Sequence, residues 1–225
     1  DALSREARDA IRQAWRTERQ VRGDTENHWV MYHTALYMMS ELYPNEPGDT
    51  WYTGKSSAEN LAETRSWLID WMDIATTIGQ GEYNPSHYIG EYAIPMVMLA
   101  SFAEDPEMKQ RGKMMLDWIF GELANVTLQG VLRGPNSRTD DTSVTERWNA
   151  LASSFSWMLF GNTPPSRNYG GFGTYFAMLG DNYEVPEVIY RIATDRQEDI
   201  YQHDRARTPD VVHQPVISRN SIISP

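Results

Sequence analysis

Cysteine is absent from this sequence of 225 residues. Its absence excludes disulfide bonds, thiol nucleophiles and thiolate metal sites. Long apolar runs are absent too, because no stretch approaches the ~20 uninterrupted apolar residues that a membrane-spanning helix needs. Residues 1–20 are charged throughout and do not have the pattern of a signal peptide. No membrane partner is therefore predicted.

Basic residues are few, since 20 Lys and Arg stand against 31 Asp and Glu and leave a net charge of −11. Non-specific nucleic-acid binding needs a basic surface, so no nucleic-acid partner is predicted. An acidic polysaccharide is still compatible with this charge, but its site must gather Arg and His side chains locally.

Aromatic residues are plentiful instead, with 8 Trp and 12 Tyr. Such side chains fill hydrophobic cores, and they also stack on sugar rings and line grooves. The remaining composition, with 40% hydrophobic and 23% charged residues, is that of an ordinary globular protein, and the length suits one domain.

Two kinds of helix alternate along the chain, which predicts an all-α fold. Amphipathic helices, with one apolar stripe and one charged face, are expected over 2–20, over 57–77 and from Asp105-Pro106 onward. Helices that are apolar on nearly every face, and so buried, are expected over 26–43, over 87–103 and from Trp148 to Phe160. Two shorter helical pieces are expected over 172–180 and 186–195.

This alternation predicts two concentric rings of antiparallel helix pairs over residues 1–196, with buried inner helices and amphipathic outer ones. All inner helices would start at the same end of the molecule, so their polar first turns would form one mouth. Residues 197–225 lose the helical period and are expected to form an irregular or extended tail. Its extended pieces are expected at Asp210–His213 and Pro215–Ser218.

The first polar cluster opens the buried helix at 26–43 and reads Asp24-Thr25-Glu26-Asn27-His28. An N-cap and the helix dipole account for its first three residues. They do not account for His28, because a cation is disfavoured at a helix start, whereas a neutral imidazole there can accept a proton. Asn27 adds an uncharged amide donor, so we expect Asn27 and His28 to act as a functional pair.

The second polar cluster, His87-Tyr88, opens the buried helix at 87–103. Tyr88 and Tyr92 are four residues apart and share a helix face, with Glu91 three residues after Tyr88. A histidine beside a tyrosine at a helix start favours acid–base chemistry, whereas Tyr92 alone is more typical of core packing.

The third polar cluster lies in a long loop over 127–143. Arg133 or Arg138 could grip a carboxylate there through the bidentate guanidinium fork, although the loop composition is equally that of a solvated segment. His28 and His33 are five residues apart and do not share a helix face, and no metal or nucleotide motif is present. No metal and no cofactor are therefore predicted.

Three short motifs resemble bacterial polysaccharide lyases with an (α/α) toroid, in particular the alginate- and glucuronan-lyase-like group. The motifs are Thr25–Trp29, Tyr83–Tyr88 and Phe102–Met108, and the resemblance spans roughly residues 20–195. Members of this family have more helix pairs, so the resemblance implies an incomplete toroid that another chain or segment completes. It also implies an acidic polysaccharide or oligosaccharide as partner, and a periplasmic or secreted location.

The resemblance implies cleavage of a uronate polymer by β-elimination. In such a reaction Asn27, helped by Arg133 or Arg138, would stabilise the substrate carboxylate as it becomes an enolate. His28 or His87 would remove the neighbouring proton. The leaving glycosidic oxygen would be protonated by Tyr88 or, as second choice, Tyr92, while Glu26 and Glu91 orient these groups.

Two other functions fit the same residues. A glycoside hydrolase needs two carboxylates across the scissile bond, and Glu26 or Glu91 could pair with Asp140 or Asp141. A non-catalytic carbohydrate-binding or scaffold protein would need only the aromatic groove and its polar rim.

Overall fold

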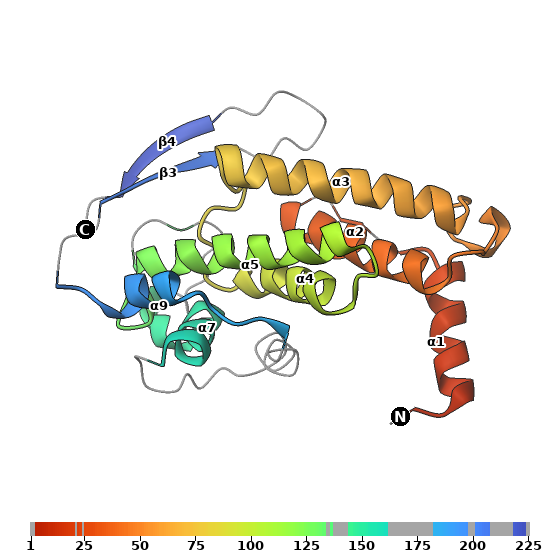
Figure 1. Ribbon diagram of the computed structural model, residues 1–225, viewed down its shortest axis with the longest axis horizontal. Coiled ribbons are helices and arrows are strands. Elements are labelled where there is room, and N and C mark those ends of the chain that lie inside the picture. The colour runs from red at the N-terminus through yellow and green to blue at the C-terminus, as the bar shows by residue number, and fades with distance from the viewer. Residues whose placement is uncertain are drawn as a thin grey trace.

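The computed structural model describes residues 3–20, 22–23, 25–133, 136, 144–161, 182–197, 201–207 and 218–223. This part of the chain is mainly helical, which confirms the all-α prediction (Figure 1). The α-helices are α1 (Arg5–Thr17), α2 (Glu26–Leu42), α3 (Ser57–Ile78), α4 (Ile89–Phe102), α5 (Pro106–Val126), α7 (Leu151–Phe160) and α9 (Glu187–Thr194). Short 3-10 turns occur at η1 (Gly48–Thr50) and η2 (Arg147–Asn149). None of the helices in these ranges has both the length and the apolar character needed to cross a bilayer.

Local sequence sets where the amphipathic helices α3 and α5 begin. At α3, the Ser56 hydroxyl accepts a hydrogen bond from the Glu59 amide at 3.4 Å, and the Glu59 carboxylate accepts one from the Ser56 amide at 2.8 Å. This reciprocal capping box satisfies two amides that a helix start leaves unpaired. At α5, the Asp105 side chain accepts from the Glu107 amide at 2.9 Å, and Pro106 takes the first helical position. Both predicted starts are confirmed.

Helices α3 and α5 run side by side in the same direction. Arg65 of α3 pairs with Asp105 at the start of α5, with a distance of 2.9 Å between Nε and the carboxylate. Further along both helices, Arg111 of α5 pairs with Asp73 of α3 at 2.9 Å. Since the two ion pairs follow one another in the same order on each helix, the helices are parallel.

Helices α2 and α4 are also parallel to each other. Near their starts, the Asn27 amide donates a hydrogen bond to Glu91. At the far end of α2, the Glu41 carboxylate accepts from the backbone amide of Glu104, between α4 and α5, at 2.9 Å. The helices thus form the antiparallel pairs α2–α3 and α4–α5, with α2 and α4 as one layer and α3 and α5 as the other (Figure 1).

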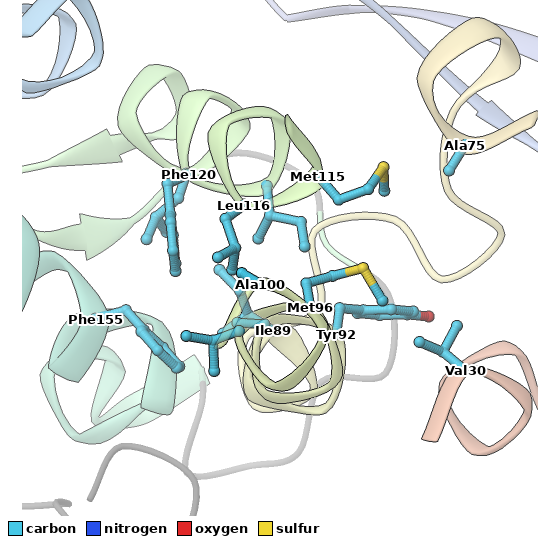
Figure 2. Close-up of a cluster of buried hydrophobic side chains, with 14 of the residues drawn as sticks. Val30, Ala75, Ile89, Tyr92, Met96, Ala100, Met115, Leu116, Phe120 and Phe155 are labelled. Atoms are coloured by element: carbon cyan, nitrogen blue, oxygen red, sulfur yellow. The ribbon is translucent and has the colours of Figure 1, made fainter. Parts of the chain in front are cut away.

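The core is centred on α4, which is buried on nearly every side as predicted. Figure 2 shows side chains from neighbouring helices gathered around it. These are Val30 of α2, Ala75 of α3, Met115, Leu116 and Phe120 of α5, and Phe155 of α7, around Ile89, Tyr92, Met96 and Ala100 of α4. Burial of large apolar side chains at this density is the main term that stabilises the helix pairs.

Two predicted helix boundaries were wrong. Trp148 was expected inside the last buried helix, but it lies in η2 and is 57% exposed. The reason is that Ala150 has an extended backbone (φ −66°, ψ 151°), which separates η2 from α7. Helix α1 is shorter than the predicted 2–20, and two residues of the predicted apolar stripe, Leu3 before α1 and Ile11 within it, are each half exposed.

Two short antiparallel sheets complete the described structure. β1 (Thr127–Leu128) pairs with β2 (Val131–Leu132), inside the segment that was expected to be a loop. In the tail, β3 (Gln202–Arg207) pairs with β4 (Ser218–Ile223), with Gln202 opposite Ile223. The extended piece predicted at Asp210–His213, most of that at Pro215–Ser218, and the helix predicted at 172–180 lie outside the described residues, whereas α9 confirms the piece at 186–195.

Candidate functional site

The first turns of α2, α4 and α7 lie together at one end of the helix bundle. Asn27, in the first turn of α2, donates a side-chain hydrogen bond to Glu91 in the first turn of α4. Ala152, in the first turn of α7, donates its backbone N–H to the carbonyl of Ser86, just before α4, at 3.0 Å. We call the connected residues at this end the helix-start cluster: Glu26, Asn27, Trp71, Glu82, Glu91 and Tyr92.

Glu26 is the anchor of this cluster. Its side chain is buried, and one carboxylate oxygen accepts from the indole N–H of Trp71 at 2.9 Å. The other oxygen accepts from the backbone amides of Gly81 at 2.6 Å and Glu82 at 3.0 Å. A buried carboxylate needs such donors to offset the loss of hydration. Glu26 therefore holds the loop after α3 against the start of α2, instead of facing a ligand.

Glu82 belongs to the cluster although no motif in the sequence marks it. It is buried, and its carboxylate accepts from the Asn27 backbone amide at 3.2 Å and from the Tyr92 hydroxyl at 2.9 Å. The preceding Gly79-Gln80-Gly81 reads only as the end of a helix. A loop residue carries no periodic signal, and one of its partners lies 55 residues upstream.

Asn27 is buried, and its side-chain amide is used at both ends. The carbonyl oxygen accepts from the Thr25 hydroxyl, and the nitrogen donates to the Glu91 carboxylate. Asn27 thus fixes the position of Glu91, which is only half-buried. Because Asn27 is buried, its amide is not presented to solvent for a hydrogen bond to a substrate carboxylate.

Tyr92, the second-choice acid, is inside the core. Its ring stacks on Trp71 with 6.0 Å between centroids and an angle of 4° between planes. Its hydroxyl is committed to Glu82. His87 and Tyr88, in contrast, are half-buried immediately before α4, at the edge of the same cluster. The Nε2 atom of His87 is itself buried.

His28 lies apart from the cluster. Consecutive helix residues project about 100° apart around the axis, and whereas Asn27 is buried, His28 is exposed. Its ring lies against Gly23 and borders a groove of about 320 Å³ between the end of α1 and α2, which Trp15 and Met31 also line. The structure therefore does not bring the expected pair Asn27 and His28 into one site.

Of the two arginines predicted to bind a substrate carboxylate, the structure describes Arg133. Arg133 is exposed directly after β2, where its backbone N–H donates to the Val126 carbonyl at 2.8 Å. Arg138, Asp140 and Asp141 lie outside the described residues. Arg147, which no sequence motif marks, is half-buried in η2 before α7 and donates to the Leu132 carbonyl at 3.3 Å.

A small cavity of about 20 Å³ lies behind the cluster, lined by Gln80, Asn84, Ile89 and Tyr92 among others. It has room for one water molecule and no more. It is too small for a sugar ring. Within the described ranges, no group of three or more His, Asp or Glu side chains is arranged to hold a metal ion.

The helix starts thus provide a fixed polar framework with an imidazole and a phenol at its edge. Such groups suit proton transfer, and aromatic surfaces suit contact with sugar rings. Compared with protein-family models, curated proteins and solved structures, the chain matches none.

Proposed function

We propose that this chain is part of an (α/α)-toroid polysaccharide lyase that cleaves a uronate polymer by β-elimination at the helix-start cluster. The observation that carries the proposal is the meeting of the first turns of α2, α4 and α7 with two half-buried proton-transfer groups at their edge, His87 and Tyr88. The motif resemblance at Thr25–Trp29 and Tyr83–Tyr88 supports the same location.

Each side chain has a separate role in the proposed reaction. A base takes the proton from the carbon next to the uronate carboxylate, and His87 is assigned this role. The electron pair then forms a carbon–carbon double bond as the glycosidic oxygen leaves, and Tyr88 donates a proton to that oxygen. Arg133 and Arg147, on the loop and turn before α7, supply positive charge toward the substrate carboxylate.

Within this proposal, Asn27 and Glu91 are positioning residues. Their hydrogen bond joins the starts of α2 and α4 and thereby fixes the turn that carries His87 and Tyr88. Glu26 accepts from the Gly81 backbone amide and Glu82 accepts from the Asn27 backbone amide. These two bonds help to hold Asn27 in place. This differs from the sequence-based expectation, in which Asn27 itself stabilises the enolate.

The incomplete toroid is also part of the proposal. The inner helix α2 has α4 on one side, whereas its other side, including Met31 and Ala35, lines a groove in the described structure. An inner helix of a closed ring has inner neighbours on both sides. Another chain or segment placed there would complete the ring, and action on a polysaccharide outside the cytoplasm would fit a periplasmic or secreted protein.

A non-catalytic carbohydrate-binding role is the second candidate. It is favoured by the amide of Asn27, which the protein itself engages at both ends, and by the separation of His28 from the cluster. A binding protein needs the framework and the aromatic edge, but no base.

The two candidates are separated by measuring the ultraviolet absorbance of unsaturated products during incubation with alginate and glucuronan. A lyase gives a rising absorbance that falls by about 10²–10⁴-fold in His87→Ala and Tyr88→Phe. His28→Ala is the matched control and should keep the wild-type rate. New reducing ends without absorbance would indicate a glycoside hydrolase, and binding without either product would indicate the binding protein.

A further inference from the structure

A second cavity lies away from the helix-start cluster, between the end of α1, the middle of α2 and the first half of α3. Its volume is about 470 Å³, within the range of roughly 300–1,000 Å³ that is usual for small-molecule sites. The side chains that give this cavity its chemistry are Arg19, Gln20, Tyr32, Tyr52, Lys55 and Glu63. None of these residues belongs to the helix-start cluster.

The wall of the cavity carries one more positive charge than negative charge. Arg19 is exposed and forms no hydrogen bond or ion pair with any described residue. The other two charged groups of the wall, Lys55 and Glu63, form an ion pair with each other. Arg19 is therefore the cation of this wall that is left to bind an anion.

Two tyrosines in the same wall supply a hydroxyl donor and an apolar surface. The Tyr52 hydroxyl donates to the Tyr32 hydroxyl at 2.9 Å, and burial raises the pKa of Tyr52, so its hydroxyl stays protonated. The hydroxyl hydrogen of Tyr32 has no acceptor among the described residues, so it can be donated to a ligand. The two rings meet edge to face, with 6.5 Å between centroids and an angle of 73° between planes.

The buried part of the wall shapes the cavity but does not bind the ligand. Both ring nitrogens of His33 and the side-chain oxygen of Asn60 are buried. Burial and, after it, the positive charge of Arg22 lower the pKa of His33 to about 3, so its ring is neutral at pH 7. Arg22 lines the groove that shares Gln20 and Tyr32 with this cavity, so a second guanidinium lies close to it.

We propose that this cavity binds a monoanionic sugar acid, namely a uronate of monosaccharide size. The guanidinium of Arg19 presents paired N–H groups that match the two oxygens of a carboxylate, and the Tyr32 hydroxyl can donate to the same anion. The carbon face of the sugar ring packs on the tyrosine rings. One excess positive charge suits a carboxylate better than a phosphate group, which carries about −1.5 to −2 at pH 7.

The site is independent of the cleavage chemistry, because its residues and those of the helix-start cluster are different. One part of the inference rests on the proposed function. If the chain cleaves a uronate polymer, this cavity is a second place at which a uronate released from that polymer binds.

The proposal is tested by NMR titration of the ¹⁵N-labelled protein with glucuronate, glucose as its neutral counterpart, and glucose 6-phosphate as the more highly charged anion. Glucuronate should bind more tightly than the other two sugars. Arg19→Gln should weaken glucuronate binding about tenfold or more, and it should fold because Arg19 is exposed and has no partner among the described residues. Arg5→Gln removes the same charge from the other end of α1, where the Arg5 side chain is 91% exposed, and should leave binding unchanged.

Three results would overturn the proposal: no glucuronate binding, equal or tighter binding of glucose or glucose 6-phosphate, or unchanged glucuronate binding by Arg19→Gln. The same titration locates the site, because glucuronate should move the backbone amide signals of Arg19, Gln20 and Thr53. If these signals stay in place at saturating glucuronate, the cavity is not the site, wherever else signals move. Cleavage at the helix-start cluster is followed separately through the absorbance of unsaturated products, so either proposal can fail while the other stands.

Discussion

The indole N–H of Trp71 in α3 donates a 2.9 Å hydrogen bond to the buried carboxylate of Glu26 in α2. The same carboxylate receives the backbone amides of Gly81 and Glu82. One side chain thus joins α2, its antiparallel partner α3 and the loop that leads to α4. This relationship makes the helix-start cluster part of the folding core as well as a candidate site.

Replacing Glu26 by Gln should destabilise the protein by about 2–3 kcal/mol, because the new NH₂ group must face one of the N–H donors that the carboxylate accepts. Urea unfolding measures the loss. Glu187→Gln is the control, since Glu187 forms an exposed pair with Arg191 on α9 and should change stability by less than about 0.5 kcal/mol. Equal effects of the two substitutions would show that Glu26 is not an anchor.

Asn27→Asp is nearly isosteric and tests the link between α2 and α4. It replaces the donor to Glu91 with a carboxylate, so like charges face one another at a buried position. We expect a loss of about 2–4 kcal/mol at pH 7. Asn45→Asp, in the exposed turn after α2, should stay within about 0.5 kcal/mol. A tolerated Asn27→Asp would mean that the Asn27–Glu91 bond does not hold the helix starts together.

Two glycines of α5 should respond oppositely to alanine. A Cβ at Gly112 would lie 2.8 Å from the Met96 carbonyl and 2.9 Å from the Ala100 amide, both in the backbone of α4. Gly112→Ala should therefore cost about 1–3 kcal/mol. At Gly121 the nearest atom is the Ile189 side chain at 3.9 Å, so Gly121→Ala should stabilise by up to about 1 kcal/mol. Thermal unfolding of the two variants distinguishes them, and a stabilising Gly112→Ala would refute the close approach of α4 and α5.

His33 should make stability depend on pH. Its pKa is about 3 in the folded protein against 6.5 when unperturbed, so between these values the unfolded chain binds more protons. Stability from this group is complete above pH 6.5 and is lost as the pH falls toward 3. Between pH 7 and pH 5 the loss should be about 2 kcal/mol. His33→Phe should lack this part of the pH dependence, and an unchanged slope would contradict it.

Helix starts were readable from sequence where a capping signal is local. Ser56 with Glu59 and Asp105 with Pro106 mark the beginnings of α3 and α5, because both signals act within one turn. Trp148 was predicted to lie in the last buried helix because an apolar residue next to such a helix continues its apolar pattern. The extended Ala150 backbone that separates them has no signature in the residue pattern.

The candidate site was readable only in part. Proximity in sequence suggested that Asn27 and His28 work together. Consecutive residues of a helix project in different directions, however, so Asn27 is buried whereas His28 is exposed. Glu82 could not be selected, because its role depends on the approach of α2 and α4 to a loop. The tail was expected to be irregular or extended, but strand β3 itself was not placed, since Gln202–Arg207 is polar apart from Ala206 and lacks an apolar alternation.

The most direct test of the central claim is hydrogen exchange, measured by mass spectrometry with and without glucuronan oligosaccharides. If the helix starts form the polysaccharide site, amide protection should increase in peptides covering 82–92 and 147–153, and this increase should be lost in Tyr88→Ala. Protection confined to other segments, or none at saturating oligosaccharide, would contradict the assignment of the helix-start cluster as the site.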